Sequence, residues 1–226
     1  MDKQDLVNRS PVRSFEKAIN GGLKAGEVGV LTSREGLGKT AVLVQFGLDT
    51  LLQDKAVVNV SFNQHSSYVI TWYEGMFNEM IKKRSIADAD TVKEEIFRNR
   101  VILNFSLEAL ADGRVFNTLK ALSQGGIKPA CLVIDGLTKA ALTPAVADSL
   151  KAFAAENGVA VWFSFSSDET DPDKIFGADV AAKLDTVVLM AQKAGGIVME
   201  VAKAHDAAVK DVCIKLDPKT LLIADK

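Results

Sequence analysis

A short glycine-containing loop holds the residues of this chain that are best suited to binding phosphate. It follows an apolar run at residues 28–32 and reads Ser33, Arg34, Glu35, Gly36, Leu37, Gly38, Lys39, Thr40 and Ala41. In a strand–loop–helix arrangement, backbone N–H groups of such a loop point at phosphate oxygens, and the dipole of the following helix favours the negative charge. We therefore expect all nine residues to contact a bound nucleotide, with Lys39 acting on the β- and γ-phosphates.

The spacing of this loop is that of a P-loop, or Walker A motif, in which the hydroxyl of Thr40 binds Mg²⁺. One position departs from the pattern, because Ser33 stands where the first glycine is usual. Serine does not share the freedom of glycine to adopt positive φ angles, so this exchange lowers the expected affinity. The alternative is an ordinary strand-to-helix turn that binds nothing.

A second candidate ligand follows another apolar run, at residues 131–134, which ends in Asp135. If this run is a central parallel strand, Asp135 lies at its carboxyl end beside the loop and holds Mg²⁺ directly or through water. The pattern has the form of a Walker B strand. An Asp that ends a strand can also be only a helix cap or a turn residue. We expect Thr40 and Asp135 to be the metal ligands.

The elements that would position these residues alternate along the chain, which is typical of an α/β fold with a mostly parallel sheet between helices. Strands are expected at residues 27–33, 56–63, 101–106, 130–136 and 158–166. Helices are expected at residues 39–53, 67–83, 89–98, 112–124 and 144–156.

The pattern changes after residue 185, where only short strands are expected, at 186–192, 196–205, 212–216 and 221–223. Turn signals at 195–196 and 217–218 predict antiparallel hairpins that extend the sheet. The chain is therefore expected to form one domain. Its parts are a lead-in at residues 1–26, an α/β core at 27–185 and C-terminal β-hairpins at 186–226.

Composition narrows the class of protein. The 226 residues are 48% hydrophobic and 25% charged, which is ordinary for a globular domain with a large core. A polar start and the lack of a long apolar run predict a cytoplasmic protein without a membrane segment. The net charge of −2 gives no basic footprint for nucleic acid. Cys131 and Cys213 lie in apolar runs and are expected to be buried, and only two histidines argue against a His/Cys metal site.

Taken together, these motifs resemble the RecA/KaiC family of P-loop ATPases, and specifically its single-domain KaiC-like members. The resemblance includes Gly21, Gly22, Leu23 and Gly26 ahead of the first strand, and it covers nearly the whole chain. Members of that family form rings or filaments with ATP bound between subunits. The resemblance thus implies a RecA-like P-loop core, ATP and Mg²⁺ as cofactors, and a homo-oligomer.

The chain departs from the family at the end of the second strand. Family ATPases carry a glutamate there that acts as a base or orients the attacking water, whereas this chain has Asn63 and Gln64. A glutamine can orient water but cannot take a proton. With Lys39, Gln64 is the catalytic candidate, and we expect weak or absent hydrolysis. The alternative is a non-catalytic, ATP-dependent oligomerisation or signalling module.

A second departure lies on a C-terminal strand. KaiC-like proteins place a Lys and an Arg, two residues apart, in the nucleotide site of a neighbouring subunit. The matching residues are Lys203 and His205, which strand alternation puts on one face. Histidine is mostly neutral at pH 7 and lacks the bidentate geometry of Arg, so a trans-acting role is weakened. Both residues can also be solvated residues of a sheet edge.

A recombinase-type role is the least favoured interpretation. In RecA-like recombinases a loop after the fifth strand contacts DNA, and the matching residues 167–185 hold six acidic residues against Lys174 and Lys183. Such a loop repels phosphates, so we expect a solvated loop and no DNA binding. Trp72, Tyr73 and Phe77 recur at helical spacing and are expected in the core or in a subunit contact rather than as a base-stacking platform.

Overall fold

The computed structural model describes residues 3–62, 64–82, 88–209 and 211–224. The strands in these ranges are β1 (Val28–Ser33), β2 (Ala56–Phe62), β3 (Arg100–Phe105), β4 (Pro129–Leu137), β5 (Ala160–Ser166), β6 (Thr186–Lys193), β7 (Gly196–Ala204), β8 (Ala207–Ala208) and β9 (Cys213–Lys215). The helices are α1 (Lys3–Asn8), α2 (Val12–Ala18), α3 (Lys39–Leu52), α4 (Ser66–Lys82), α5 (Ala89–Phe97), α6 (Glu108–Ala111), α7 (Arg114–Gln124), α8 (Pro144–Asn157), α9 (Pro172–Phe176) and α10 (Ala178–Ala181).

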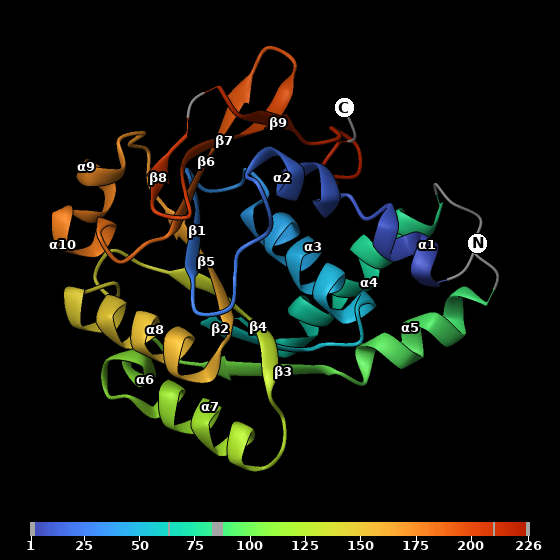
Figure 1. Ribbon diagram of the computed structural model, residues 1–226, viewed down its shortest axis with the longest axis horizontal. Helices are drawn as coiled ribbons and strands as arrows, with labels where there is room; N and C mark the ends of the chain where they lie inside the picture. The colour runs from blue at the N-terminus through green and yellow to red at the C-terminus, as the bar shows by residue number, and fades with distance from the viewer. Residues whose placement is uncertain (1–2, 63, 83–87, 210, 225–226) are drawn as a thin grey trace.

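The strands of the described ranges form one sheet in the order β3-β2-β4-β5-β1-β6-β7-β8, with β9 also paired to β7 (Figure 1). Every pairing from β3 to β6 is parallel, and the pairings made by β7 are antiparallel. The predicted α/β class, with a mostly parallel sheet and antiparallel C-terminal strands, is confirmed at this level.

Helices cover both faces of the sheet, and each face has its own hydrophobic core (Figure 1). On one face, the buried side of α3 packs with α4 and the lead-in helices; on the other, α7 and α8 pack with α9 and α10. Strand residues alternate between the two cores, so Leu31 faces α3 while Val28 and Val30 face α8. Burial on both faces explains why β1, β2 and β4 read as nearly continuous apolar runs.

Residues 167–185 match the expected solvated loop only in part, because five of their six acidic residues are exposed but the segment is not a loop throughout. They form the short helices α9 and α10, and their Ile175, Val180 and Leu184 are buried in the second core. Asp185 is also buried, because it begins the turn into β6 and accepts a hydrogen bond from the Val28 N–H at 2.6 Å. Apolar residues between the acidic ones therefore fold this segment onto the sheet.

Three further differences concern the ends of the chain. The lead-in contains two helices, α1 and α2, where no element was expected. The predicted strand at 221–223 is reduced to a single bridge between Leu216 and Ile223. Cys131 is buried as predicted, but the prediction for Cys213 is wrong, since it is exposed. Alternation along β9 turns Ile214 inward and its neighbours outward.

Two glycines allow close approach between elements. A Cβ atom at Gly29 of β1 would lie 2.6 Å from the ring of Trp162, and one at Gly47 of α3 would lie 2.3 Å from the Tyr73 hydroxyl. Tyr73 itself is fully buried, as its helical spacing with Phe77 predicted. Gly47 therefore sets how closely α3 and α4 pack.

Among the helices of the described residues, none is long and apolar enough to cross a bilayer.

Candidate functional site

Parallel strands bring several polar residues to the carboxyl-terminal edge of the sheet. β1 pairs with β5 as far as Ser33 and Ser166, and β2 pairs with β4 as far as Ser61 and Asp135. β5 lies between β1 and β4. The loop at residues 33–40, which we call the 33–40 loop, and Asp135 therefore meet at one edge although they are far apart in the chain.

The first turn of α3 contacts Asp135 directly. Thr40 Oγ1 donates a hydrogen bond to Asp135 Oδ2 at 2.7 Å. The other carboxylate oxygen accepts from Ser164 Oγ, which itself accepts from the Gly136 N–H at 2.9 Å. Asp135 is only 7% exposed, so α3 and β5 together hold its carboxylate in one orientation. The two predicted metal ligands are adjacent and offer the hydroxyl and carboxylate oxygens that Mg²⁺ prefers.

Lys39 bends back over the loop that precedes it. Its Nζ donates to the Ser33 carbonyl at 3.0 Å, to Ser33 Oγ at 3.2 Å and to the Arg34 carbonyl at 2.9 Å. Burial lowers the pKa of Lys39, and the negative charges of Asp135 and Glu35 partly offset this effect. The ammonium group is thus held at the mouth of the loop by neutral oxygens, which an incoming anion can replace.

The backbone of the loop depends on two glycines. Gly36 has φ of +79° and Gly38, the residue before α3, has φ of +85°, a region that other residues rarely occupy. Ser33, by contrast, is the last residue of β1 and is buried at 5% exposure. The serine therefore lies in extended structure, where the absence of glycine carries little conformational cost.

Exposure separates the predicted contact residues into two groups. The side chains of Leu37 and Ala41 are buried in the protein, so these two residues can offer a ligand only their backbone N–H groups. The side chains at the tip of the loop are exposed, namely those of Arg34 and Glu35. The groups of the loop that remain accessible for the predicted phosphate contacts are thus mainly its backbone N–H groups and the side chains of Lys39 and Thr40.

Gln64 follows the end of β2 at the same edge of the sheet as Asp135. Its Oε1 is buried and has no hydrogen-bond partner among the described residues. Asn63, the other residue predicted for the position of the catalytic carboxylate, lies outside the described residues. After β2, the Gln64 side chain thus offers an amide oxygen as an unpaired acceptor, and within β2 the buried Asn59 Nδ2 and Ser61 Oγ also have no partner among the described residues.

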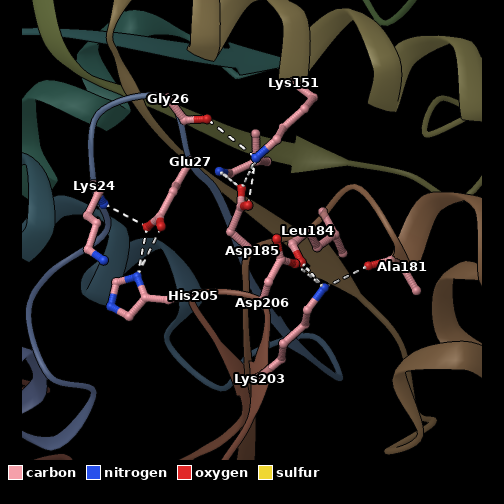
Figure 2. A network of polar contacts seen from close by, with 11 residues as sticks. Lys24, Gly26, Glu27, Lys151, Ala181, Leu184, Asp185, Lys203, His205 and Asp206 are labelled. Carbon is pink, nitrogen blue, oxygen red and sulfur yellow. Dashed lines mark hydrogen bonds and ion pairs between the residues drawn. The ribbon is translucent and has the colours of Figure 1, made fainter.

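Lys203 lies away from the 33–40 loop, because it pairs with Val187 at the start of β6, whereas the loop follows the end of β1, which runs parallel to β6. Its Nζ donates to the Leu184 carbonyl at 2.5 Å and forms an ion pair with Asp206 Oδ1 at 2.8 Å (Figure 2). Nearby, the carboxylate of Asp185 pairs with Lys151 at 2.5 Å. Within one chain, Lys203 is thus part of a polar network around the start of β1 and β6.

His205 does not share a strand face with Lys203, so that expectation is wrong. β7 ends at Ala204, and His205 and Asp206 form a two-residue turn to β8 with φ angles of 48° and 63°. Such positive values are characteristic of tight hairpin turns. The imidazole Nδ1 lies 2.9 Å from Glu27 Oε2, on the other side of the network from Lys203 (Figure 2).

Ser164 is a site residue that sequence reasoning missed. It is buried on β5, between the strand that carries the loop and the strand that carries Asp135, and it bonds to the Asp135 carboxylate. The available signal was a pair of serines, Ser164 and Ser166, at alternate positions near the carboxyl end of an otherwise apolar strand. Polar residues at that end of a parallel strand lie where ligands bind in open α/β sheets.

A groove of about 380 Å³ borders the loop at Ser33, Arg34 and Leu37. Its lining also includes Asp168 and Glu169 together with Arg34. The carboxylates would repel a phosphate, so the predicted phosphate contacts are better placed on the side of the loop that faces Asp135.

Among the described residues, no group of three or more His, Cys, Asp or Glu side chains is arranged to hold a metal ion. Comparison of the chain with protein-family models and with curated proteins gives no match. The interpretation of the site therefore rests on its own geometry.

Proposed function

We propose that this chain binds ATP with Mg²⁺ at the 33–40 loop and hydrolyses it slowly or not at all. The observation that carries the proposal is the 2.7 Å hydrogen bond between Thr40 and Asp135, which joins the first turn of α3 to the end of β4. An incidental strand-to-helix turn would not require a buried carboxylate beside the first hydroxyl of the helix. The RecA/KaiC-like resemblance, with its P-loop core, is part of this proposal.

The residues fit the cofactor in donor type. Thr40 and Asp135 supply hard oxygen ligands, and Gly36 and Gly38 hold the backbone in a conformation that exposes N–H groups. Bound Mg²⁺ would neutralise phosphate charge. Lys39 would exchange its loop carbonyl partners for phosphate oxygens, and Ser164 would keep the Asp135 carboxylate oriented.

Slow hydrolysis follows from the residue at the end of β2. The free Oε1 of Gln64 can accept a hydrogen bond from a water molecule and orient it, but an amide cannot remove its proton. Loss of a general base typically costs a factor of about 10² to 10⁴ in rate. We therefore assign Gln64 a water-positioning role at most.

A single-turnover experiment with γ-labelled ATP, Mg²⁺ and excess protein tests this proposal. Bound ATP and released phosphate are scored together, and both are expected to disappear in Lys39→Ala. Gln64→Glu restores a carboxylate and is expected to raise the rate of phosphate release by about tenfold or more. Binding of ATP that is indifferent to Lys39→Ala would contradict the proposed site.

The second candidate function is a nucleotide-dependent oligomerisation or signalling module, with ATP at a subunit interface. It is favoured by the amide at Gln64 and by the partners that Lys203 and His205 have within the chain, which occupy the two side chains that the resemblance would place in a neighbouring site. Light scattering with and without ATP distinguishes the two. An ATP-dependent change in mass without phosphate release supports the module, whereas release without a change in mass supports the weak ATPase.

A further inference from the structure

The two edges of the sheet differ in how well they are protected against pairing with another strand. At one edge, β8 has two residues and β9 has three, and such short strands offer little backbone to a partner. At the other edge, β3 is the outermost strand and extends over six residues (Figure 1). It contains no Pro or Gly, and its register against β2 has no bulge. β3 therefore lacks several of the features that usually keep an edge strand from pairing.

The backbone of β3 presents a regular row of free hydrogen-bonding groups. The Val57 N–H donates to the Asn99 carbonyl at 2.9 Å, so Asn99 points toward β2. Because backbone direction alternates along a strand, Arg100, Ile102 and Asn104 point away from β2. Within the described ranges, the backbone N–H and C=O groups of these three residues have no hydrogen-bond partner. They are thus available to an extended segment lying alongside β3.

The side chains of β3 make this edge apolar and leave it partly exposed. Four of them pack against one of the two cores and yet are not fully buried, namely Val101, Ile102, Leu103 and Phe105. In the neighbouring β2, by contrast, every residue after Ala56 is buried. The one charged residue of β3, Arg100, has its guanidinium 4.1 Å from the ring centroid of Phe97, which holds it against a helix of the same chain. The surface that remains at the edge suits a second apolar strand.

Two charged side chains beside the ends of β3 indicate what that strand is. Arg98 precedes β3 and Glu108 follows it; both are exposed, and neither forms an ion pair with a described residue. Glu94 and Glu95 of α5 balance the charge of the first end as a whole, so the complementarity is one between two side chains. In an antiparallel second copy of β3, Glu108 lies beside Arg98 at one end and Arg98 beside Glu108 at the other. A second copy of this chain therefore complements both ends at once.

Hydrogen bonding selects the register of such a pair. In an antiparallel ladder, two opposite residues that face each other's strand exchange an N–H and a C=O bond. Pairing about Ile102 places Ile102 opposite its own copy and Arg100 opposite Asn104 of the second copy, so all outward backbone groups are used in about six bonds. Val101 then packs beside Leu103 of the second copy. We propose that two copies of this chain associate through β3 in this antiparallel register, which joins their sheets into one. The proposal does not rest on nucleotide binding.

Light scattering of the full chain without nucleotide, at concentrations from about 1 μM to about 200 μM, tests this association. The mass is expected to approach twice that of the chain as concentration rises. It is expected to do the same in Lys39→Ala and with ATP and Mg²⁺ added. A single-chain mass at every concentration would overturn the proposal. A dimer that forms only with ATP would also overturn it, and would support the nucleotide-dependent module instead.

A pair of variants at one position locates the interface. Asn104 is exposed and its N–H points away from β2, so Asn104→Pro removes a bond to the second copy and leaves the ladder to β2 intact. Two such bonds are lost in the symmetric dimer, and the dissociation constant is expected to rise by at least about tenfold. Asn104→Ala keeps the N–H and is expected to dimerise as the wild type does. Circular dichroism checks the fold, and equal dimerisation of the two folded variants would overturn the proposal.

A charge exchange tests the antiparallel direction without touching the strand. Arg98→Glu places a negative charge beside Glu108 of the second copy and is expected to weaken the dimer by about threefold or more. Adding Glu108→Arg to the same chain restores both pairs with their ends exchanged and is expected to recover the affinity. Both side chains are exposed, so the fold of a single chain should not change. A double variant as weak as Arg98→Glu alone would overturn the antiparallel arrangement.

Discussion

The two ends of α3 serve two polar regions that are built in different ways. At its start, the 33–40 loop and Asp135 satisfy each other, since Lys39 donates to three loop oxygens and Asp135 accepts from two hydroxyl groups. Near its end, Asp49 is equally buried but keeps one oxygen without a partner among the described residues. A ligand at the loop must therefore replace the internal partners of Lys39 and Asp135, whereas Asp49 Oδ1 is enclosed by the protein and has no described partner to exchange.

The two regions also differ in how far apart their residues lie along the sequence. The 33–40 loop is a continuous segment whose proposed ligand contacts are mostly backbone N–H groups and two adjacent side chains. The cavity at Asp49 combines α2, α3, β4 and β5, so that Trp162 of β5 lies beside residues of α2 and α3 that are more than 100 positions earlier in the chain. A mutation can therefore test one region without altering the other.

The largest expected effect is the loss of ATP binding in Lys39→Ala. Loss of its charge-assisted bonds to phosphate should weaken ATP binding by about a hundredfold. Fluorescence titration with a labelled ATP analogue measures the affinity. An unchanged affinity would show that Lys39 does not contact the phosphates.

Gly47→Ala tests α3 as the element that the two regions share. The added Cβ would lie 2.3 Å from the Tyr73 hydroxyl, so we expect a loss of about 1–3 kcal/mol in the free energy of unfolding. Urea unfolding measures it. The matched control is Gly75→Ala in α4, where a Cβ meets nothing within 4 Å and the better helix propensity should stabilise by up to about 1 kcal/mol.

Ser164→Ala tests only the region of the 33–40 loop and Asp135. It removes the hydroxyl that donates to Asp135 and accepts from the Gly136 N–H, so the Mg²⁺-dependent part of ATP affinity should fall by about 1 kcal/mol. ATP titrations with Mg²⁺ and with EDTA give this difference. Equal effects in both buffers would mean that Ser164 supports the fold rather than the orientation of Asp135.

Glu16→Gln is expected to have the smallest effect and concerns pH. Because burial raises the pKa of Glu16 above its ordinary 4.5, the folded protein holds this proton more tightly than the unfolded chain does. Its contribution to stability is complete below 4.5 and is lost as pH rises through the raised pKa. Urea unfolding across this window should show the wild type losing stability relative to Glu16→Gln. A difference that is independent of pH would contradict this assignment.

Much of the fold could be predicted from the sequence because periodicity reports burial directly. The apolar runs of β1, β2, β4 and β5 and the helical spacing of α3 and α8 match the described elements within a few residues. The misses arose where tertiary contacts decided the outcome. Residues 167–185 carry many charges, yet Ile175 and Val180 fold them onto the sheet, and His205 takes a turn conformation because β7 pairs with β8.

The sequence by itself determined the 33–40 loop as a candidate phosphate site, since the pattern of such a loop depends on adjacent residues, and it indicated Asp135 through the strand before it. Only the tertiary structure decided that Thr40 and Asp135 touch across β5, that Ser164 orients the carboxylate, and that Lys203 and His205 have partners within the chain. The cavity at Asp49 could not be predicted from the sequence. Its lining comes from four separate elements, α2, α3, β4 and β5, which only the tertiary structure brings together.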